Sequence, residues 1–224
     1  MDKSPVCALL MLCLLLPVGT WGQEAGQPVT GEAKAAFLRT WSERLQAMQS
    51  LHMVFTQEKY LRVLRQPLVA QGELWLKGDT LLYVLKNAAG DTELAVRLDP
   101  QAVQMHYPVL HTLEVIDLRN AQLPALPLPF LNREPTAFIK EYDANLFVAS
   151  ELYTLVLVPR DAKSPLAEVR FTLKDFAPQI FTQVEKNGTR LTMRILAFTV
   201  NPDMREAQLE LHIPPGTTVT YPLQ

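Results

Sequence analysis

Ser50-Leu-His-Met-Val-Phe-Thr-Gln57 and, a little further on, Gly72-Glu-Leu-Trp-Leu-Lys-Gly-Asp-Thr-Leu-Leu-Tyr-Val84 decide the fold of this chain. Apolar and polar side chains alternate along both stretches, which is the period of a β-strand with one buried face. Lys77-Gly-Asp-Thr80 supplies the small and polar residues typical of a hairpin turn. The two stretches therefore predict consecutive antiparallel strands that share one apolar surface.

The same period of two recurs through the rest of the chain. Val103–Tyr107, Val169–Lys174 and Leu191–Ile195 alternate cleanly, and Leu209–Ile213 is expected to be the last strand. Asn187-Gly188 predicts a type I′ hairpin turn before one of these strands. Strands at this spacing are typical of a large antiparallel sheet.

Two helices are expected beside the strands. Ala33–Met48 carries Phe37, Trp41 and Leu45 at helical spacing, and Thr136–Val148 is expected to form a shorter helix. One helix followed by many hairpin-spaced strands predicts an α+β fold. We expect a curved antiparallel sheet forming an incomplete, half-open β-barrel, covered by the N-terminal helix and a short helical or loop lid.

The N-terminus has the features of a secretory leader. Lys3 gives a basic start, Val6–Leu16 is a short apolar core, and cleavage is expected near Gly22. We therefore expect a signal peptide at 1–22 and a single domain at 23–224. Both cysteines, Cys7 and Cys13, lie within the leader, and bulky residues before Cys13 argue against a lipid anchor.

Composition and motifs argue against several classes of function. A net charge of −2 and a pI near 6.1 are unlike a nucleic-acid-binding surface, so we expect no nucleic-acid partner. The sequence has no Gly-x-Ser-x-Gly motif and no phosphate-binding glycine loop. The period-two pattern places His106 and His212 on solvent-facing sides of strands. We expect a monomer that is not an enzyme and has no catalytic residue, metal or cofactor.

The apolar strand faces and a proline-rich segment predict a cavity for a lipid. One side of each strand would line it: Met53, Phe55, Leu74, Leu76, Leu82, Val84, Val103, Met105 and Tyr107. The segment Ala121–Leu131 contains three prolines, so it cannot continue a strand or a regular helix. Its apolar residues would cover the cavity as a static plug or a moving lid: Leu126, Leu128, Phe130 and Leu131.

The order of these motifs resembles the LolA-like family of periplasmic outer-membrane lipoprotein carriers. The resemblance runs from about Ala33 to Val219. It is carried by Phe55-Thr-Gln57, Gly72–Lys77 and the closing Ile213-Pro-Pro-Gly-Thr-Thr-Val219, with Leu128-Pro-Phe-Leu131 where the family has its lid helix.

The resemblance implies a half-barrel with a hydrophobic cavity and a role as a carrier. Members of the family accept an acylated lipoprotein from an inner-membrane ABC transporter complex and deliver it to an outer-membrane acceptor. It therefore implies a periplasmic location and these three partners, or another lipid as cargo. One position departs from the family: Gly78 stands where an arginine helps to hold the lid closed, so lid control is expected to differ.

Two other functions remain open from the sequence. The same scaffold could serve as a non-enzymatic sensor or interaction module for lipids or lipoproteins, with a stable protein partner at a sheet edge. A small periplasmic hydrolase is a third possibility, since a carboxylate pair is defined in space rather than in sequence.

Overall fold

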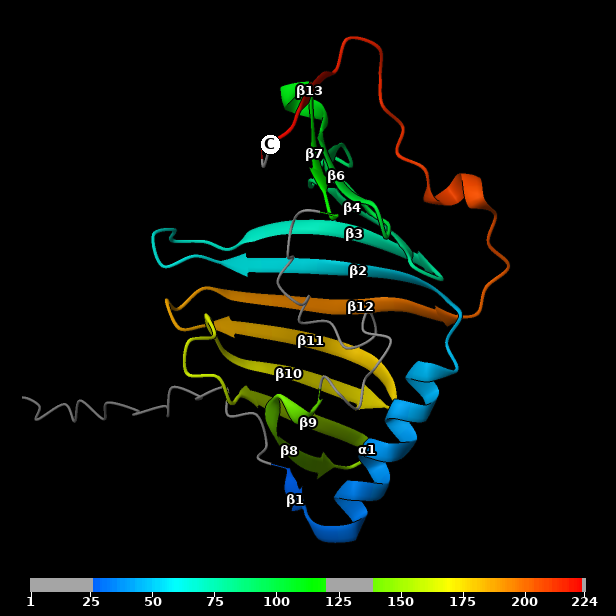
Figure 1. Cartoon of the computed structure of the whole chain (residues 1–224). Helices are drawn as coiled ribbons and strands as arrows, with labels where there is room; N and C mark the ends of the chain where they lie inside the picture. Colours follow the sequence, from blue (N-terminus) through cyan, green and yellow to red (C-terminus); the bar gives the residue numbers. More distant parts are fainter. Residues whose placement is uncertain (1–25, 120–138, 223–224) are drawn as a thin grey trace, which may run out of the picture.

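The computed structural model describes residues 26–119 and 139–222. In these ranges one unclosed sheet of thirteen strands curves through the molecule, and one long helix, α1 (Gly31–Gln46), lies against it (Figure 1). The predicted fold class, a curved antiparallel and half-open sheet with an N-terminal helix, is confirmed. The predicted lid residues Leu126, Leu128, Phe130 and Leu131 and the leader lie outside the described residues.

The strands are joined mostly by hairpins, and all neighbours are antiparallel except the last pair. In chain order they are β1 (Gln27–Val29), β2 (Ser50–Tyr60), β3 (Leu68–Lys77), β4 (Thr80–Lys86), β5 (Thr92–Leu98), β6 (Ala102–Tyr107), β7 (Thr112–Asp117), β8 (Tyr142–Ala149), β9 (Leu152–Pro159), β10 (Leu166–Lys174), β11 (Ala177–Glu185), β12 (Arg190–Val200) and β13 (Thr218–Thr220). Two short 3₁₀ turns, η1 (Pro108–Leu110) and η3 (Glu206–Leu209), complete the described elements.

The order across the sheet is β1-β8-β9-β10-β11-β12-β2-β3-β4-β5-β6-β7-β13. The central pair of strands is β2 and β12, which brings together residues that are far apart in sequence, such as Leu51 and Val200. On the other side of β2, Phe55 lies opposite Gly72 of β3. The stretch Ser50–Gln57 therefore lies in the strand that joins the two halves of the sheet.

Helix α1 covers the apolar face of β8, β9 and β10 at the lower right of Figure 1. Phe37 packs on Tyr153 with ring centroids 4.7 Å apart, and Trp41 packs on Phe171 at 5.7 Å. The Lys34 ammonium donates to the Ala144 carbonyl at 2.7 Å. The apolar stripe predicted from helical spacing is thus the face of α1 that is buried on the sheet.

Three local predictions were wrong. Tyr142–Ala149 forms β8, not a helix, because its alternating residues pair with β9 across a short hairpin. Leu209–Ile213 forms no strand, since η3 ends at Leu209 and the chain after it pairs with nothing until β13. The Asn187-Gly188 turn is not type I′, because Asn187 lacks the positive φ that this turn requires.

The chain leaves the sheet after β12 and rejoins the sheet at its outer edge as β13. We call Asn201–Thr217 the C-terminal strap; it runs up the right side of Figure 1 in orange and red. Asn201 fixes its start, because its side-chain oxygen accepts from the amides of Gln49 and Ser50 at 2.8 and 3.1 Å. The Thr218 amide donates to the His111 carbonyl at 2.8 Å, which leads the strap into its pairing with β7.

Candidate functional site

The strand register sorts the side chains of the sheet onto two faces. We call the face of β2 that carries Leu51, Met53 and Phe55 the apolar face, because all three are buried there. Leu74 and Leu76 of β3 pair with Met53 and Leu51 and share that face. Residues that lie opposite each other in neighbouring strands point to the same face of the sheet. The pairings from β3 through β4 and β5 to β6 therefore place three residues of β6 on the apolar face: Val103, Met105 and Tyr107.

Leu82 and Val84, predicted to line the cavity, lie on the opposite face of the sheet. Lys77 pairs with Thr80, so the hairpin turn brings Leu81 opposite Leu76 and Leu82 opposite Trp75. The apolar face of β4 therefore carries Leu81, and a shift of one residue in register moves every side chain to the other face. The sequence could not decide this point, because Leu81 to Leu85 is apolar at every position.

Phe55 and Tyr83 stack on the apolar face, with ring centroids 5.6 Å apart. The Phe55 ring also covers Gly72, where a Cβ would come within 2.2 Å of it. The Tyr83 hydroxyl donates to Gln57 Oε1 at 2.8 Å, so this polar group is satisfied within the apolar surroundings. Burial raises the pKa of Tyr83 well above its usual range, which keeps the phenol neutral.

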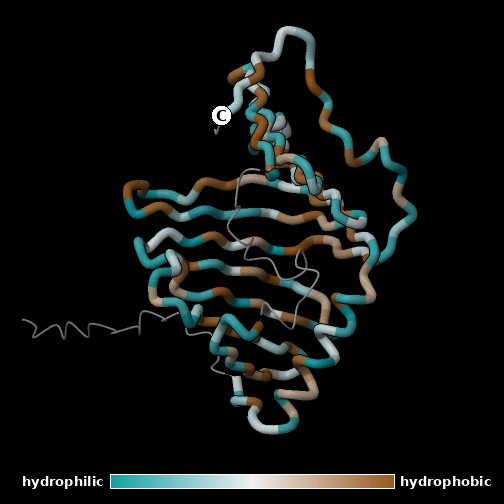
Figure 2. Tube along the Cα trace, viewed as in Figure 1, coloured by the Kyte–Doolittle hydropathy of each residue, from teal (hydrophilic) through white to brown (hydrophobic). Residues whose placement is uncertain are grey.

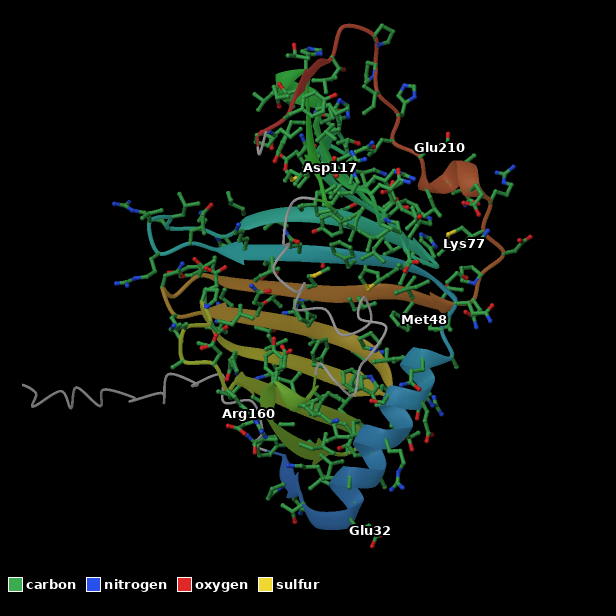
Figure 3. The ribbon with its side chains drawn as sticks, in the orientation of Figure 1. Glu32, Met48, Lys77, Asp117, Arg160 and Glu210 are labelled. Carbon is green, nitrogen blue, oxygen red and sulfur yellow. The ribbon has the colours of Figure 1, made fainter. Side chains whose placement is uncertain are left out.

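A pocket opens on the apolar face between the C-terminal half of α1 and strands β10 to β12. Its volume is about 280 Å³. Its lining is almost wholly apolar and consists of Trp41, Arg44, Leu45, Met48, Phe171, Leu173, Asp175, Phe176, Ala177, Pro178, Phe198 and Val200. Figure 3 shows Met48 at the end of α1 beside the sheet. None of the predicted cavity residues lines this pocket, although Met53, Phe55, Leu74 and Leu76 belong to the same core cluster as its walls.

The polar groups of the pocket are gathered at its rim. The Arg44 guanidinium donates from Nη1 to the Asp175 carbonyl at 3.1 Å and lies 4.6 Å from the centre of the Phe176 ring. Phe176 in turn stacks on Phe37 at 4.9 Å. A cation held over an aromatic ring is stabilised by the ring's electron density. The pocket therefore combines an apolar interior with two charged residues of opposite sign, Arg44 and Asp175, at its edge.

The turn that carries Phe176 is strained. Lys174 pairs with Ala177, so Asp175 and Phe176 form a two-residue hairpin loop with φ angles of +49° and +67°. A bulky residue with positive φ costs on the order of 1–3 kcal/mol, and such positions cluster at functional sites. The contacts of the Phe176 ring with Phe37 and Arg44 offset this cost.

Sequence reasoning missed Arg44 and Phe176. Arg44 lies three residues after Trp41 and four before Met48, so helical spacing puts it on the flank of the same apolar stripe. That spacing was a usable signal. The sequence around Phe176 gave no such signal. A tight turn between two strands can be predicted from sequence, but its contact with a helix far away in the chain cannot.

The opposite face carries a second, smaller apolar cluster beneath the C-terminal strap. Met204 and Leu209 of the strap are buried there against Leu82, with Trp75, Val84 and Leu211 packed around them. The Lys77 ammonium donates to the Met204 carbonyl at 2.9 Å and lies 3.0 Å from Glu206. Lys77 is labelled beside this segment in Figure 3. This cluster explains why Leu82 and Val84 are apolar.

The histidines do not form a chemical centre in the described part of the chain. No group of three or more His, Cys, Asp or Glu residues there could hold a metal ion. His106 is only 4 % exposed, which corrects its predicted solvent-facing position. Its burial, together with the charges of His111 and His212, lowers its pKa. Leu113 of β7 lies directly opposite His106 in the sheet, and His212 of the strap is near enough for its charge to act on it.

No helix within residues 26–119 and 139–222 is long and apolar enough to cross a membrane.

Comparisons with known proteins show a shared fold. No protein-family model matches the sequence, and no curated protein matches it. An uncharacterised conserved protein from Thermus thermophilus matches with a TM-score of 0.53 at 12 % identity, over 84 % of this chain and 99 % of that one. The likeness to the Thermus protein is one of fold.

Two further structural matches have TM-scores below 0.5. A LolA superfamily protein from Nitrosomonas europaea matches with a TM-score of 0.43 at 9 % identity, over 78 % of this chain and 97 % of that one. A chain of the Pseudomonas aeruginosa MucA/MucB complex matches with a TM-score of 0.45 at 17 % identity, over 80 % of this chain and 62 % of that one.

Proposed function

We propose that the protein is a periplasmic carrier that binds acyl chains of lipoproteins, or of a related lipid, on the apolar face of its sheet. The observation that carries the proposal is the pocket between α1 and β10–β12. Its walls are aromatic and aliphatic, and its charged groups, Arg44 and Asp175, lie at the rim. An arrangement of this kind accepts a hydrocarbon chain and leaves the polar end of the ligand near water.

The energetics of such binding need no specific polar contact inside the pocket. Removing each methylene from water contributes about 0.8 kcal/mol. About ten buried methylenes therefore supply the roughly 8 kcal/mol that corresponds to micromolar binding. The volume of about 280 Å³ lies just below the range of roughly 300–1,000 Å³ for ligand pockets, which suits one chain or part of one. Release then requires an acceptor with greater affinity, because no chemical step drives it.

The transport part of the proposal rests on the sequence. A secretory leader and the resemblance to lipoprotein carriers favour movement of the cargo from the inner to the outer membrane. In that role an inner-membrane ABC transporter complex would load the protein and an outer-membrane acceptor would unload it. Gly78 replaces the family's latch arginine, so control of loading would come from other contacts.

Quenching of Trp41 fluorescence by a brominated fatty acid tests binding in this pocket. Trp41 lines the pocket, whereas Trp75 lies on the opposite face. Trp75→Phe in the chain without residues 1–22, which contain Trp21, therefore isolates the signal. We expect saturable quenching. Ala177→Leu, which extends a side chain into the pocket, should weaken binding at least tenfold, because it displaces methylenes worth about 0.8 kcal/mol each.

Ala162→Leu is the matched control, because Ala162 lies in an exposed turn away from the pocket. It should bind as tightly as the parent. Quenching that is absent, or equal in Ala177→Leu and Ala162→Leu, would contradict acyl binding at this site. A stable complex with a membrane-anchored signalling protein, without any acyl binding, would favour the sensor alternative instead.

A further inference from the structure

The turn between β2 and β3 exposes apolar side chains that nothing in the described structure covers. We call residues Tyr60–Val69 the hairpin tip. Val63 is 87 % exposed, and four further large apolar side chains of the tip are exposed: Tyr60, Leu64, Leu68 and Val69. The tip lies at the left edge of the sheet in Figure 1 and carries hydrophobic residues at its end in Figure 2. Clusters of this kind mark sites of interaction.

The tip is a defined structure. The Leu64 amide donates to the Leu61 carbonyl at 2.9 Å and closes a turn with Arg62 and Val63 at its centre. Arg62 also packs beside the neighbouring β11–β12 turn, where a Cβ on Gly188 would lie 2.8 Å from its side chain. The two turns therefore support each other and hold Val63 outward.

Basic side chains surround the exposed apolar ones. Arg62 and Arg65 lie on the tip, and Lys59 directly precedes it, next to the acidic Glu58. Lys186 and Arg190 lie at the adjoining turn with one acidic residue, and Arg190 lies 5.8 Å from the Tyr60 ring. Within the described residues neither Arg62 nor Arg65 takes part in a salt bridge. This corner is thus positive on a chain whose net charge is −2.

We propose that the hairpin tip docks the protein on an anionic lipid surface, with Val63 and Leu64 entering the interface and the arginines meeting lipid headgroups. Apolar side chains flanked by lysine and arginine are the composition of segments that lie in the membrane interface. Long basic side chains can keep their charged ends among the headgroups while their stems lie along apolar groups. The lipid surface would bring the pocket of the proposed carrier near its cargo, although docking itself does not require that function.

The geometry favours a lipid surface over a protein partner. Leu68 and Val69 are consecutive on a strand, so their side chains point to opposite faces, yet they are 52 % and 58 % exposed. A protein partner covers one face of a hairpin, whereas a fluid apolar medium surrounds both. The five apolar residues are also far fewer than the roughly 20–30 residues that each side of a stable protein interface contributes.

Co-sedimentation with vesicles tests the proposal. We expect the purified protein to bind vesicles of equal parts phosphatidylglycerol and phosphatidylcholine, to bind phosphatidylcholine alone much more weakly, and to release as salt rises. The double variant Val63→Asp with Leu64→Asp should lose at least tenfold in affinity. Arg62→Gln with Arg65→Gln should lose about fivefold for each charge on anionic vesicles only.

Two control pairs separate the tip from general changes in hydrophobicity and charge. Val109→Asp with Leu110→Asp alters two apolar residues that are 74 % and 69 % exposed in η1, without flanking arginines. Arg39→Gln with Lys163→Gln removes two exposed charges elsewhere. Both should bind vesicles like the parent.

Three results would overturn the docking proposal: no binding of the parent to anionic vesicles, full binding by the tip variants, or an equal loss in the controls. Capture of a protein partner through the tip without any vesicle binding would overturn it too. Quenching of Trp41 by the brominated fatty acid is measured on the same variants. Intact quenching with failed vesicle binding would refute docking and leave the carrier proposal standing.

Discussion

Gly72 shows how one residue without a side chain allows the two central strands to carry a large ring. Phe55 is fully buried and lies across from Gly72 in the register of β2 and β3. A Cβ at Gly72 would lie 2.2 Å from Cζ of the Phe55 ring, which is far closer than carbon atoms approach in proteins. Packing against Phe55 therefore requires a glycine at position 72. Backbone conformation does not require it, because the φ of Gly72 is not positive.

Gly72→Ala should destabilise the protein by about 1–3 kcal/mol, because the added methyl group overpacks a filled core. Urea denaturation measures the change as a lower midpoint with an unchanged slope. Gln71→Ala, on the exposed side of the same strand, is the control and should change stability little. Adding Phe55→Leu to Gly72→Ala should recover part of the loss; an additive effect of the two changes would contradict the packing explanation.

His106 should make stability depend on pH. Burial, followed by the charges of His111 and His212, lowers its pKa from the ordinary value of 6.5, and its Nε2 has no hydrogen-bond partner among the described residues. The unfolded chain therefore binds more protons than the folded one below about pH 6.5. Stability should fall as the pH drops from 6.5 toward the folded pKa.

His106→Phe removes this titration and should flatten the decline. The check is the urea midpoint of both proteins at pH 7.5, 6.5 and 5.5, values chosen to span the ordinary pKa of about 6.5. His106→Phe can shift all midpoints through packing, so the difference in slope with pH is the informative quantity. Equal slopes would show that His106 does not contribute.

At the scale of elements, the C-terminal strap replaces a strand that the sequence led us to expect. Its alternating residues Leu209, Leu211 and Ile213 look like a strand, but they do not pair. Leu209 packs on the opposite face of β4 instead, and its carbonyl accepts from Arg97 Nε at 3.1 Å. An alternating pattern shows that one side of a segment is buried. It does not show whether the backbone of that segment pairs with another strand.

Lys77→Met should loosen the strap without unfolding the sheet. The change keeps the aliphatic stem but removes the ammonium that binds the Met204 carbonyl and Glu206. Because these groups are partly exposed, the cost in global stability should be about 1 kcal/mol or less. Hydrogen exchange should speed up at strap amides such as Gln208. Lys163→Met, at an exposed turn, should leave exchange in the strap unchanged; equal exchange in both variants would refute the anchoring role.

At the scale of the whole molecule, the pairing of β2 with β12 joins the two halves of one continuous sheet. One half is β1 and β8–β12 with α1, and the other is β2–β7 with the strap and β13. The core cluster crosses this seam, since it includes Met53 and Phe55 from β2 and Met193 from β12. We therefore expect the halves to unfold together.

Thr192→Pro tests this coupling, because Thr192 pairs with Glu58 of β2 and Thr182 of β11 in the middle of the sheet. Proline cannot donate to a ladder and is confined to edge strands, so the loss should be at least about 1–3 kcal/mol. Trp41 and Trp75 report on the two halves and should show one shared, lower urea midpoint. Val219→Pro, in the three-residue edge strand β13, should change it little; separate midpoints would contradict a single cooperative sheet.

The sequence by itself determined most of the strands, the long helix and the apolar face that several strands share. Period two identified β2, β3 and β6, and helical spacing identified α1, because both patterns reflect one-sided burial within a single element. It also placed Met53, Phe55, Leu74 and Leu76 on a common face. These inferences need no knowledge of distant neighbours.

Only the tertiary structure decided what meets across elements. Leu82 and Val84 lie on the opposite face because the turn at Gly78 sets a register that a run of apolar residues cannot specify. Arg44 reaches the pocket rim because α1 packs over a hairpin more than a hundred residues away in the chain. Long-range packing fixes such pairs, and a sequence pattern records that a residue is buried without naming the residue that buries it.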